Sequence, residues 1–234
     1  MKDLSLLDVE QVDQIEVEAA SISFKQLGIL VLDGSGSMVG ELNLDKIPKG
    51  KAVSQAVRGL FNRFKDSRIA DSFCFSVIYY DEKARRVMDV TDIKDVDSEQ
   101  DFNPTIGMGG LTYIYKGLEE AKKVSDEFFA APNPQQISRK AVIVVLSDGV
   151  DMMPKEAERV LAKLKKDNRI TVATCFFETL GAKRSKMDEC QKYMEGLATS
   201  PAFSQSVATT EGLRKFFTAS VTGILADDDR LSIK

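Results

Sequence analysis

The fold of this chain is decided by residues 29–37, whose sequence is Ile-Leu-Val-Leu-Asp-Gly-Ser-Gly-Ser. Four consecutive apolar residues are typical of a central parallel strand, because helices cover such a strand on both faces. Polar side chains then alternate with glycines, which indicates a loop that leaves the carboxyl end of the strand. Residues 141–148, Ala-Val-Ile-Val-Val-Leu-Ser-Asp, show the same arrangement. The two segments therefore predict neighbouring central strands, each followed by polar residues.

Strand-like and helix-like patterns alternate along the rest of the chain, which predicts βα units and a parallel sheet. Strands are expected near residues 26–32, 73–80, 86–90, 141–147, 170–177 and 204–208. Apolar residues at helical spacing predict helices over residues 52–64, 114–128, 157–164 and 213–224. We expect an α/β protein with a doubly wound, mostly parallel, six-stranded, Rossmann-like sheet and helices on both faces. The longest predicted loops are residues 92–110 and 131–139.

The composition is that of a globular protein with one domain. The chain has 234 residues, of which 43% are hydrophobic and 29% charged. No apolar run approaches the roughly 20 residues that a membrane helix needs. Acidic residues are scattered through residues 1–24, where a signal peptide would carry basic and apolar blocks, so we expect a cytoplasmic protein. With a net charge of −4 and no dense block of Lys and Arg, neither nucleic acid nor membrane is an expected partner.

The chain contains no histidine. A Ser-His-Asp triad, a histidine general base and the usual histidine-containing zinc sites are therefore excluded. Among the three cysteines, Cys74 and Cys175 lie inside strand-like runs and are expected to be reduced residues of the core. The composition thus argues against most hydrolases that work at neutral pH.

Side chains that carry oxygen are expected to meet where the two central strands end. Asp33, Ser35 and Ser37 follow the first strand, and Asp148 follows the second. The carboxyl ends of neighbouring parallel strands lie together at the topological switch point, where such folds place their sites. A glycine-rich loop before Thr112 can deliver its hydroxyl to the same edge. Two carboxylates and three hydroxyls form an oxygen set suited to Mg²⁺, Mn²⁺ or Ca²⁺.

Three motifs, in this order along the chain, resemble the metal-ion-dependent adhesion site (MIDAS) of von Willebrand factor A (VWA) domains. They are Asp-x-Ser-x-Ser at residues 33–37, Thr-x₄-Gly-Leu at residues 112–118 and Asp-Gly at residues 148–149. The resemblance covers residues 25–226. It departs from the family at Leu111, which separates the glycines from the threonine where many members have Gly-Gly-Thr.

The resemblance implies a specific site and activity. Ser35, Ser37 and Thr112 would be direct metal ligands. Asp33 and Asp148 would bind the ion directly or through water. The ion, Mg²⁺ by availability, would take an Asp or Glu carboxylate from a protein partner at an open coordination position. The implied protein is not an enzyme but an intracellular, prokaryotic-type interaction module, similar to VWA proteins encoded with tellurium-resistance and other stress or signalling proteins.

The expected organisation is an N-terminal extension at residues 1–24, a VWA-like domain at residues 25–226 and a tail at residues 227–234. Residues 1–24 are compatible with a peripheral helix or an edge strand. On the domain surface, we expect the apolar or aromatic side chains of three residues to surround the partner carboxylate. These residues are Met38, Val39 and Tyr113.

Other interpretations of the same residues are weaker. Residues 33–37 alone would suit a glycine-rich turn whose polar side chains cap backbone groups. A dinucleotide fold would begin its helix within the glycines, whereas the helical period begins near Lys51, and Asp81 lies too far along for a ribose-binding acid. A P-loop is excluded because Gly-x₄-Gly-Lys-Ser/Thr does not occur. The alternative function is a Mg²⁺-dependent phosphotransferase or phosphatase-like enzyme with Asp33 as nucleophile, although Ser35 stands where such enzymes usually have a second aspartate.

Overall fold

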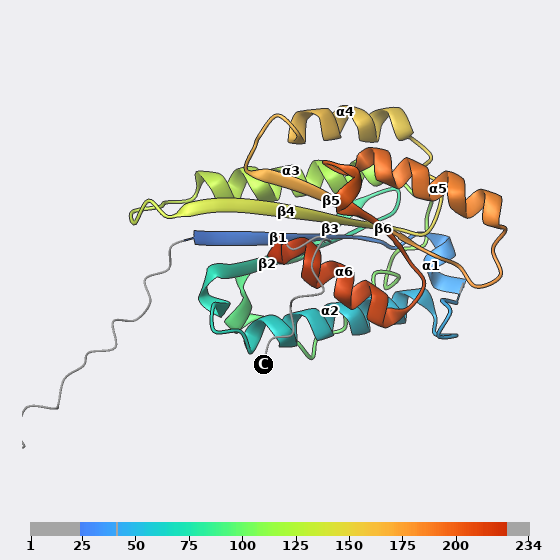
Figure 1. Ribbon diagram of the computed structural model, residues 1–234, viewed down its shortest axis with the longest axis horizontal. Coiled ribbons are helices and arrows are strands. Elements are labelled where there is room, and N and C mark those ends of the chain that lie inside the picture. Colours follow the sequence, from blue (N-terminus) through green and yellow to red (C-terminus); the bar gives the residue numbers. More distant parts are fainter. Residues whose placement is uncertain (1–23, 41, 224–234) are drawn as a thin grey trace, which may run out of the picture.

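A six-stranded sheet lies between two layers of helices (Figure 1). The structure is a computed structural model and describes residues 24–40 and 42–223. Its strands are β1 (Phe24–Asp33), β2 (Phe73–Tyr80), β3 (Ala84–Asp92), β4 (Ser138–Ser147), β5 (Ile170–Phe177) and β6 (Ser204–Val207). They are ordered β3-β2-β1-β4-β5-β6, with β3 antiparallel to β2 and the other pairs parallel. The predicted doubly wound, mostly parallel α/β fold is confirmed.

The two segments that carry the sequence signal are the central strands β1 and β4. Residues 27–33 of β1 and residues 141–147 of β4 are buried. Their parallel register pairs Leu32 with Leu146, so the two strands end side by side. Continuous burial explains why residues 27–32 of β1 and 141–146 of β4 contain no polar side chain instead of alternating apolar with polar residues.

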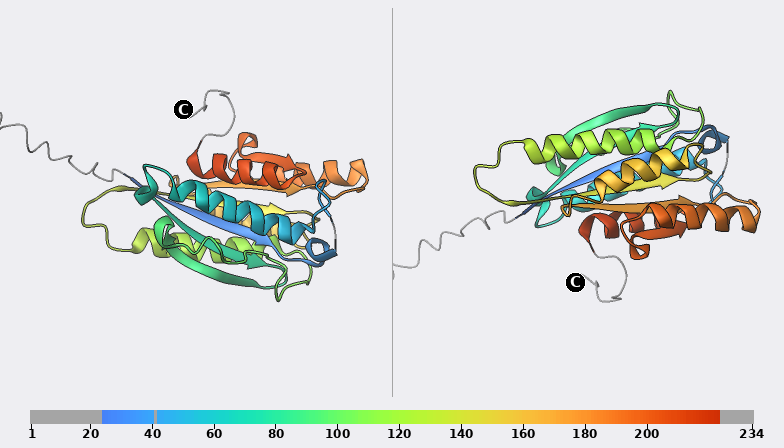
Figure 2. Two further views of the ribbon diagram at one scale, coloured as in Figure 1. Left: turned by 90° about the horizontal axis from the view of Figure 1, so that it is seen from below. Right: turned by 90° about the horizontal axis from the view of Figure 1, so that it is seen from above.

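Helices cover both faces of the sheet, as the opposite views of Figure 2 show. One buried cluster joins the sheet to α2 and α6, and the other joins it to α3, α4 and α5. These helices are α2 (Lys49–Lys65), α3 (Ile114–Ala130), α4 (Pro154–Leu164), α5 (Arg184–Leu197) and α6 (Thr210–Thr222). The four predicted helices correspond to α2, α3, α4 and α6. No described helix is both long and apolar enough to cross a membrane.

Two helices were not predicted. In α5, only Cys190, Met194 and Leu197 are buried among 14 residues, which is too sparse an apolar face to give a clear helical period. The other is α1 (Gly36–Gly40), a single turn directly after β1. The premise that no helix begins within these glycines was therefore wrong. This turn nevertheless ends well before the long helix α2 begins.

Three 3₁₀ turns complete the described structure, at Ala70–Ser72, Ile93–Asp95 and Pro201–Phe203. The predicted extension and tail lie outside the described residues, except that β1 already begins at Phe24. Ile224, the last apolar residue of the predicted final helix, lies outside them as well.

Candidate metal centre

Asp33, the last residue of β1, is held by both of its carboxylate oxygens. Its Oδ1 accepts a hydrogen bond from the Ser35 backbone N–H at 2.8 Å, and its Oδ2 accepts one from the Ser147 hydroxyl at 2.7 Å. Ser147 is the last residue of β4, and it was not predicted as part of the site. Because Asp33 is 0% exposed, these bonds fix a buried carboxylate at the junction of the two central strands.

The predicted serines connect this junction to the second aspartate. The hydroxyl of Ser37 donates to Asp148 Oδ1 at 2.6 Å, and the hydroxyl oxygens of Ser35 and Ser37 are 3.2 Å apart. One continuous hydrogen-bonded group is therefore formed by Asp33, Ser35, Ser37 and Asp148, although Ser37 and Asp148 are far apart in the chain. The sequence prediction that these four residues meet at one edge agrees with this geometry.

The negative charge of Asp148 acts on the carboxyl group of Asp33. Burial, and then the negative charge of Asp148, raise the pKa of Asp33 to about 7, although hydrogen bonds from Ser35 and Ser147 oppose the rise. Two carboxylates in a buried site disfavour each other's charged form, and a bound cation would relieve this repulsion.

Thr112 faces the same point from the loop before α3. A Cβ atom placed on Gly149 would lie 3.9 Å from Thr112 Oγ1 and 3.8 Å from Ser37 Oγ, so both hydroxyls border the space beside this glycine. Thr112 and Ser37 also line two adjoining cavities, one shared with Ser35 and the other with Asp148. The exposed Leu111 lines one of these cavities beside Thr112, and the threonine still borders the same space as Ser35 and Ser37.

An acidic residue after β2 shapes the glycine loop that precedes Thr112. Asp81 Oδ2 accepts hydrogen bonds from the backbone N–H groups of Gly109 at 3.2 Å and Gly110 at 3.1 Å. The Gly110 carbonyl in turn accepts a hydrogen bond from the Gly36 N–H at 3.0 Å. Asp81 thus positions the loop against α1. This role of Asp81 could not be predicted from the sequence, because the contact joins segments that are distant in the chain.

A second buried acid organises the other side of Thr112. Asp151 Oδ1 accepts hydrogen bonds from the backbone N–H groups of Ile114 at 3.3 Å and Met153 at 3.1 Å, where α3 and α4 begin. Its Oδ2 accepts a hydrogen bond from the Tyr193 hydroxyl of α5 at 2.6 Å. Asp151 therefore fixes the starts of two helices next to the site.

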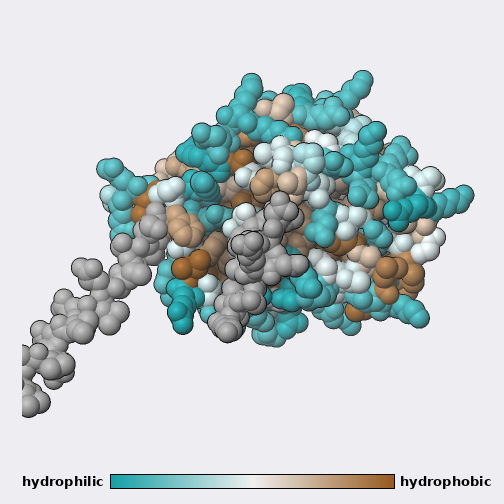
Figure 3. All heavy atoms as spheres, in the orientation of Figure 1, coloured by the Kyte–Doolittle hydropathy of each residue, from teal (hydrophilic) through white to brown (hydrophobic). Residues whose placement is uncertain are grey.

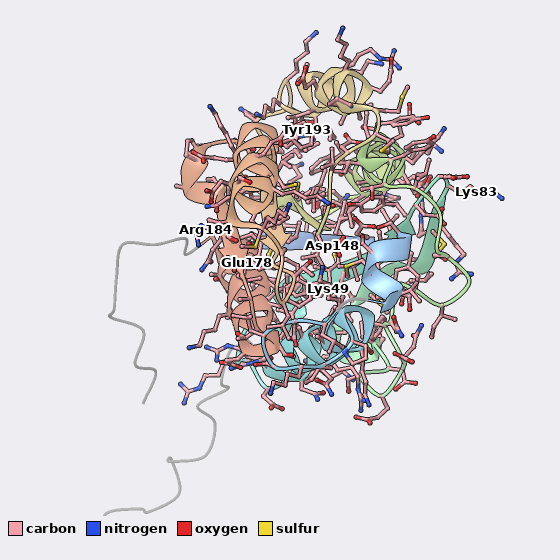
Figure 4. All side chains as sticks on the ribbon, turned by 90° about the vertical axis from the view of Figure 1, so that its right-hand side faces the viewer. Lys49, Lys83, Asp148, Glu178, Arg184 and Tyr193 are labelled. Atoms are coloured by element: carbon pink, nitrogen blue, oxygen red, sulfur yellow. The ribbon has the colours of Figure 1, made fainter. Side chains whose placement is uncertain are left out.

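A buried lysine was missed by the sequence analysis. Lys49 is the first residue of α2 and is 0% exposed, and its ammonium donates to Asp148 Oδ2 and to Thr179 Oγ1. Figure 4 looks onto the edge where the strands end and shows Lys49 beside Asp148. A signal existed in the sequence, because a lysine in the first turn of a helix opposes the helix dipole. Such a position indicates a partner of opposite charge.

Apolar side chains border the polar centre. A cavity of about 650 Å³ next to Asp148 is lined on its far side by residues 179–183 and by Lys186 and Met187 of α5. Exposed apolar residues on the surrounding loops line the two cavities, namely Leu42, Leu111, Val150, Met152 and Leu180. Figure 3 shows hydrophobic surface at the right-hand end of the molecule, where α1 lies.

The prediction that Met38 borders the site was wrong, because Met38 is 0% exposed and belongs to the core. The single turn of α1 directs this side chain inward and leaves the next one, Val39, 53% exposed. Tyr113 is half-buried beside the site.

The donor set fits a hard divalent cation. Within residues 24–40 and 42–223, no group of three or more His, Cys, Asp or Glu side chains gathers to hold a metal. An ion at this edge would therefore depend on hydroxyl oxygens in addition to carboxylates. Hydroxyls and carboxylates are the oxygen ligands that Mg²⁺, Mn²⁺ and Ca²⁺ accept.

Residues 29–219 match the family described as von Willebrand factor type A domain. No curated protein matches the chain. Among solved structures, the pilus adhesin SpaC from Lactobacillus rhamnosus GG has a TM-score of 0.65 at 14% identity, over 86% of this chain and 31% of the adhesin. This chain thus spans about a third of that protein's length.

Two further structures have the same fold. The vWF domain of the type V pili tip protein Mfa5 from Porphyromonas gingivalis has a TM-score of 0.59 at 11% identity, over 89% of this chain and 99% of the domain. Proximal thread matrix protein 1 from the mussel byssus, in a structure with a zinc-occupied MIDAS motif, has a TM-score of 0.56 at 20% identity, over 86% of this chain and 46% of its own. These likenesses show the shared fold, and the family match over residues 29–219 shows that the chain belongs to the von Willebrand factor type A domain family.

Proposed function

We propose that this VWA domain binds a protein partner through a divalent cation at the edge where β1 and β4 end. VWA domains generally mediate protein–protein interactions, and some of them use a MIDAS metal. The observation that carries the proposal is the 2.6 Å hydrogen bond from Ser37 to Asp148, which joins the Asp-x-Ser-x-Ser motif to the second motif aspartate. It supports a single site made from both halves of the sheet.

The ion would be held by the five motif residues together. They are Asp33, Ser35, Ser37, Thr112 and Asp148. Three of these ligands are neutral hydroxyls, so they would leave much of the ion's charge uncompensated. When bound, the ion would supply the positive charge that an incoming Asp or Glu carboxylate requires. Mg²⁺ is the proposed ion because it is abundant and favours oxygen ligands.

The surroundings support a protein segment as the partner. Exposed apolar side chains such as Leu111, Val150 and Met152 line the cavities at the polar centre. A contact with a charged centre and an apolar border suits a partner that presents one carboxylate among apolar residues. The whole chain carries a net charge of −4, and the site itself contains two carboxylates, so the ion would be needed to attract an anionic group.

The environment of Asp33 favours this function over phosphoryl transfer. A nucleophilic aspartate must present an oxygen to the substrate. Asp33 is 0% exposed, and both of its oxygens already accept hydrogen bonds, from Ser35 and Ser147. These contacts support a positioning and charge-bearing role for Asp33.

We also propose that the protein works in a reducing compartment, which agrees with the predicted cytoplasmic location. All three cysteines are unpaired and buried, namely Cys74, Cys175 and Cys190. Disulfides are typical of oxidising environments, so buried free thiols favour the cytoplasm. A role in a stress-response or signalling complex, as in tellurium-resistance relatives, remains a prediction from the family resemblance.

The proposal is tested by thermal unfolding with Mg²⁺, Mn²⁺ or Zn²⁺, compared with chelator. An ion that binds the folded state raises the melting temperature through linkage. Ser37→Ala should abolish most of this rise. Ser220→Ala is the matched control, because the Ser220 hydroxyl donates only to the Phe216 carbonyl of its own helix. An equal rise in the wild type and Ser37→Ala would contradict the proposed site.

Partner binding is tested by capture from lysate with Mg²⁺ and with chelator. Proteins that the wild type retains only with Mg²⁺, and that Ser37→Ala does not retain, would support the mechanism. For one such protein, removal of its contacting Asp or Glu should cause no further loss when Ser37→Ala is already present. Fully additive losses would mean that the metal site and the partner carboxylate are not in contact.

A further inference from the structure

The buried ammonium of Lys49 is not required by the motif, yet it contacts one of the motif's two carboxylates. We propose that Lys49 is a specificity-determining residue: it weakens the binding of the ion and strengthens the binding of an anionic partner to the ion-loaded site. This inference rests on the proposed function, because it assigns a role to Lys49 within the same metal centre.

The position of Lys49 is fixed from two sides. Its Nζ donates to Asp148 Oδ2, while the other oxygen of Asp148 accepts the Ser37 hydroxyl. It also donates to the hydroxyl of Thr179, in the loop after β5. Lys49 and Asp148 side chains are both 0% exposed. Solvent therefore screens the charge of Lys49 poorly at the metal centre.

The charges of the site explain the proposed effect. Asp33 and Asp148 carry two negative charges when ionised, and Lys49 carries one positive charge. A divalent ion would bring this group to a net charge of plus one, and one partner carboxylate would then make it neutral. Without Lys49, the loaded site would be one unit less positive, and a partner carboxylate would add its charge to a site that compensates it less. Buried uncompensated charge is unfavourable, so Lys49 should favour the complex with an anion.

The same charge acts in the opposite direction on the ion alone. An ammonium bonded to Asp148 repels a nearby cation and satisfies part of the charge that would otherwise attract it. A merely structural ion pair would have a different signature. Its removal would lower stability and weaken ligand binding generally, and it would not shift the two affinities in opposite directions.

The test replaces Lys49 with neutral residues in the full chain. Lys49→Gln retains a hydrogen-bond donor, and Lys49→Met retains the length of the side chain. Mn²⁺ affinity, measured by electron paramagnetic resonance of the free ion, should increase about tenfold in either variant. Lys49→Arg, which keeps the charge, should stay within about twofold of the wild type. Melting with chelator and with Mn²⁺ verifies folding, and Mn²⁺ should rescue the neutral variants more than the wild type.

The second measurement uses acetate as the carboxylate probe. With the protein saturated by Mn²⁺ at low ionic strength, paramagnetic relaxation of the acetate methyl protons reports binding beside the ion. Acetate affinity should fall about fivefold or more in Lys49→Gln and remain near the wild-type value in Lys49→Arg. Thr179→Val, which removes the hydrogen bond to Lys49 but no charge, should resemble Lys49→Arg.

The outcomes separate this inference from the proposed function. If the wild type binds no Mn²⁺, both are overturned. If the wild type binds Mn²⁺ and acetate but the neutral variants show no tighter Mn²⁺ binding or no weaker acetate binding, only the role of Lys49 is overturned. Should one neutral variant fail to fold even with Mn²⁺, the other neutral variant decides. Loss of folding in both, with Lys49→Arg intact, would make Lys49 a structural residue and would also overturn the inference.

Discussion

Replacing Ser147 with alanine would test how the buried carboxylate of Asp33 is supported, without altering a proposed metal ligand. Ser147 is 0% exposed, and its hydroxyl donates to Asp33 Oδ2 at 2.7 Å. The variant leaves an oxygen of a buried, charged group without this donor. Hydrogen bonds to charged groups contribute about 1.5–3 kcal/mol, so the free energy of unfolding should fall by about 2 kcal/mol. For a domain of this size, the melting temperature should fall by about 4–8 °C.

The assay is urea unfolding followed by circular dichroism, at pH 8 with chelator. Asp33 is mostly ionised at pH 8, because its pKa is about 7. Ser125→Ala is the matched control: Ser125 is also 0% exposed, but its hydroxyl donates to the Ala121 carbonyl of its own helix. We expect the control to lose less than about 1 kcal/mol. Equal losses in the two variants would refute the special role of the Ser147 contact.

Three further predictions concern the site and its supports. Mg²⁺ should raise the melting temperature more at pH 8 than at pH 6. The pKa of Asp33 is raised from the ordinary 3.8 to about 7, so the stability of the metal-free fold falls as pH rises between these values. At pH 6 the ion must also displace a proton from Asp33, which it need not do at pH 8. Equal thermal shifts at both pH values would contradict this. Asp81→Ala should weaken Mn²⁺ binding, measured by calorimetry, by several-fold, because it removes the hydrogen bonds that hold the glycine loop before Thr112. Unchanged Mn²⁺ affinity would show that these hydrogen bonds are not needed to position the loop. Tyr193→Phe removes the hydrogen bond to Asp151 and should lower the free energy of urea unfolding by about 1 kcal/mol, while an unchanged midpoint would contradict a supporting role.

The fold could be predicted because burial and hydrophobic period agree along most of the chain. Residues 27–32 of β1 and 141–146 of β4 are buried on both faces and therefore contain no polar side chain. The prediction failed at α5, where most side chains face solvent and only three buried residues carry the pattern. It also failed at Met38, because one turn of helix after β1 decides which neighbouring side chain enters the core.

The polar centre could be predicted in part because its motif residues follow strand ends, and parallel strands end together. This reasoning places Asp33, Ser37 and Asp148 at one edge. It does not find Ser147 or Lys49, whose roles depend on contacts across the fold and on complete burial. The lysine at the start of α2 opposes the helix dipole, and this local conflict was the available sign of a buried partner.

The proposed metal centre is tested most directly by the anomalous scattering of Mn²⁺ in crystals of the protein grown with this ion. We expect one strong peak among the hydroxyl oxygens of Ser35, Ser37 and Thr112, and its loss in crystals of Ser37→Ala. A strong peak elsewhere with none at this position, at a Mn²⁺ concentration that raises the melting temperature, would contradict the proposed metal centre.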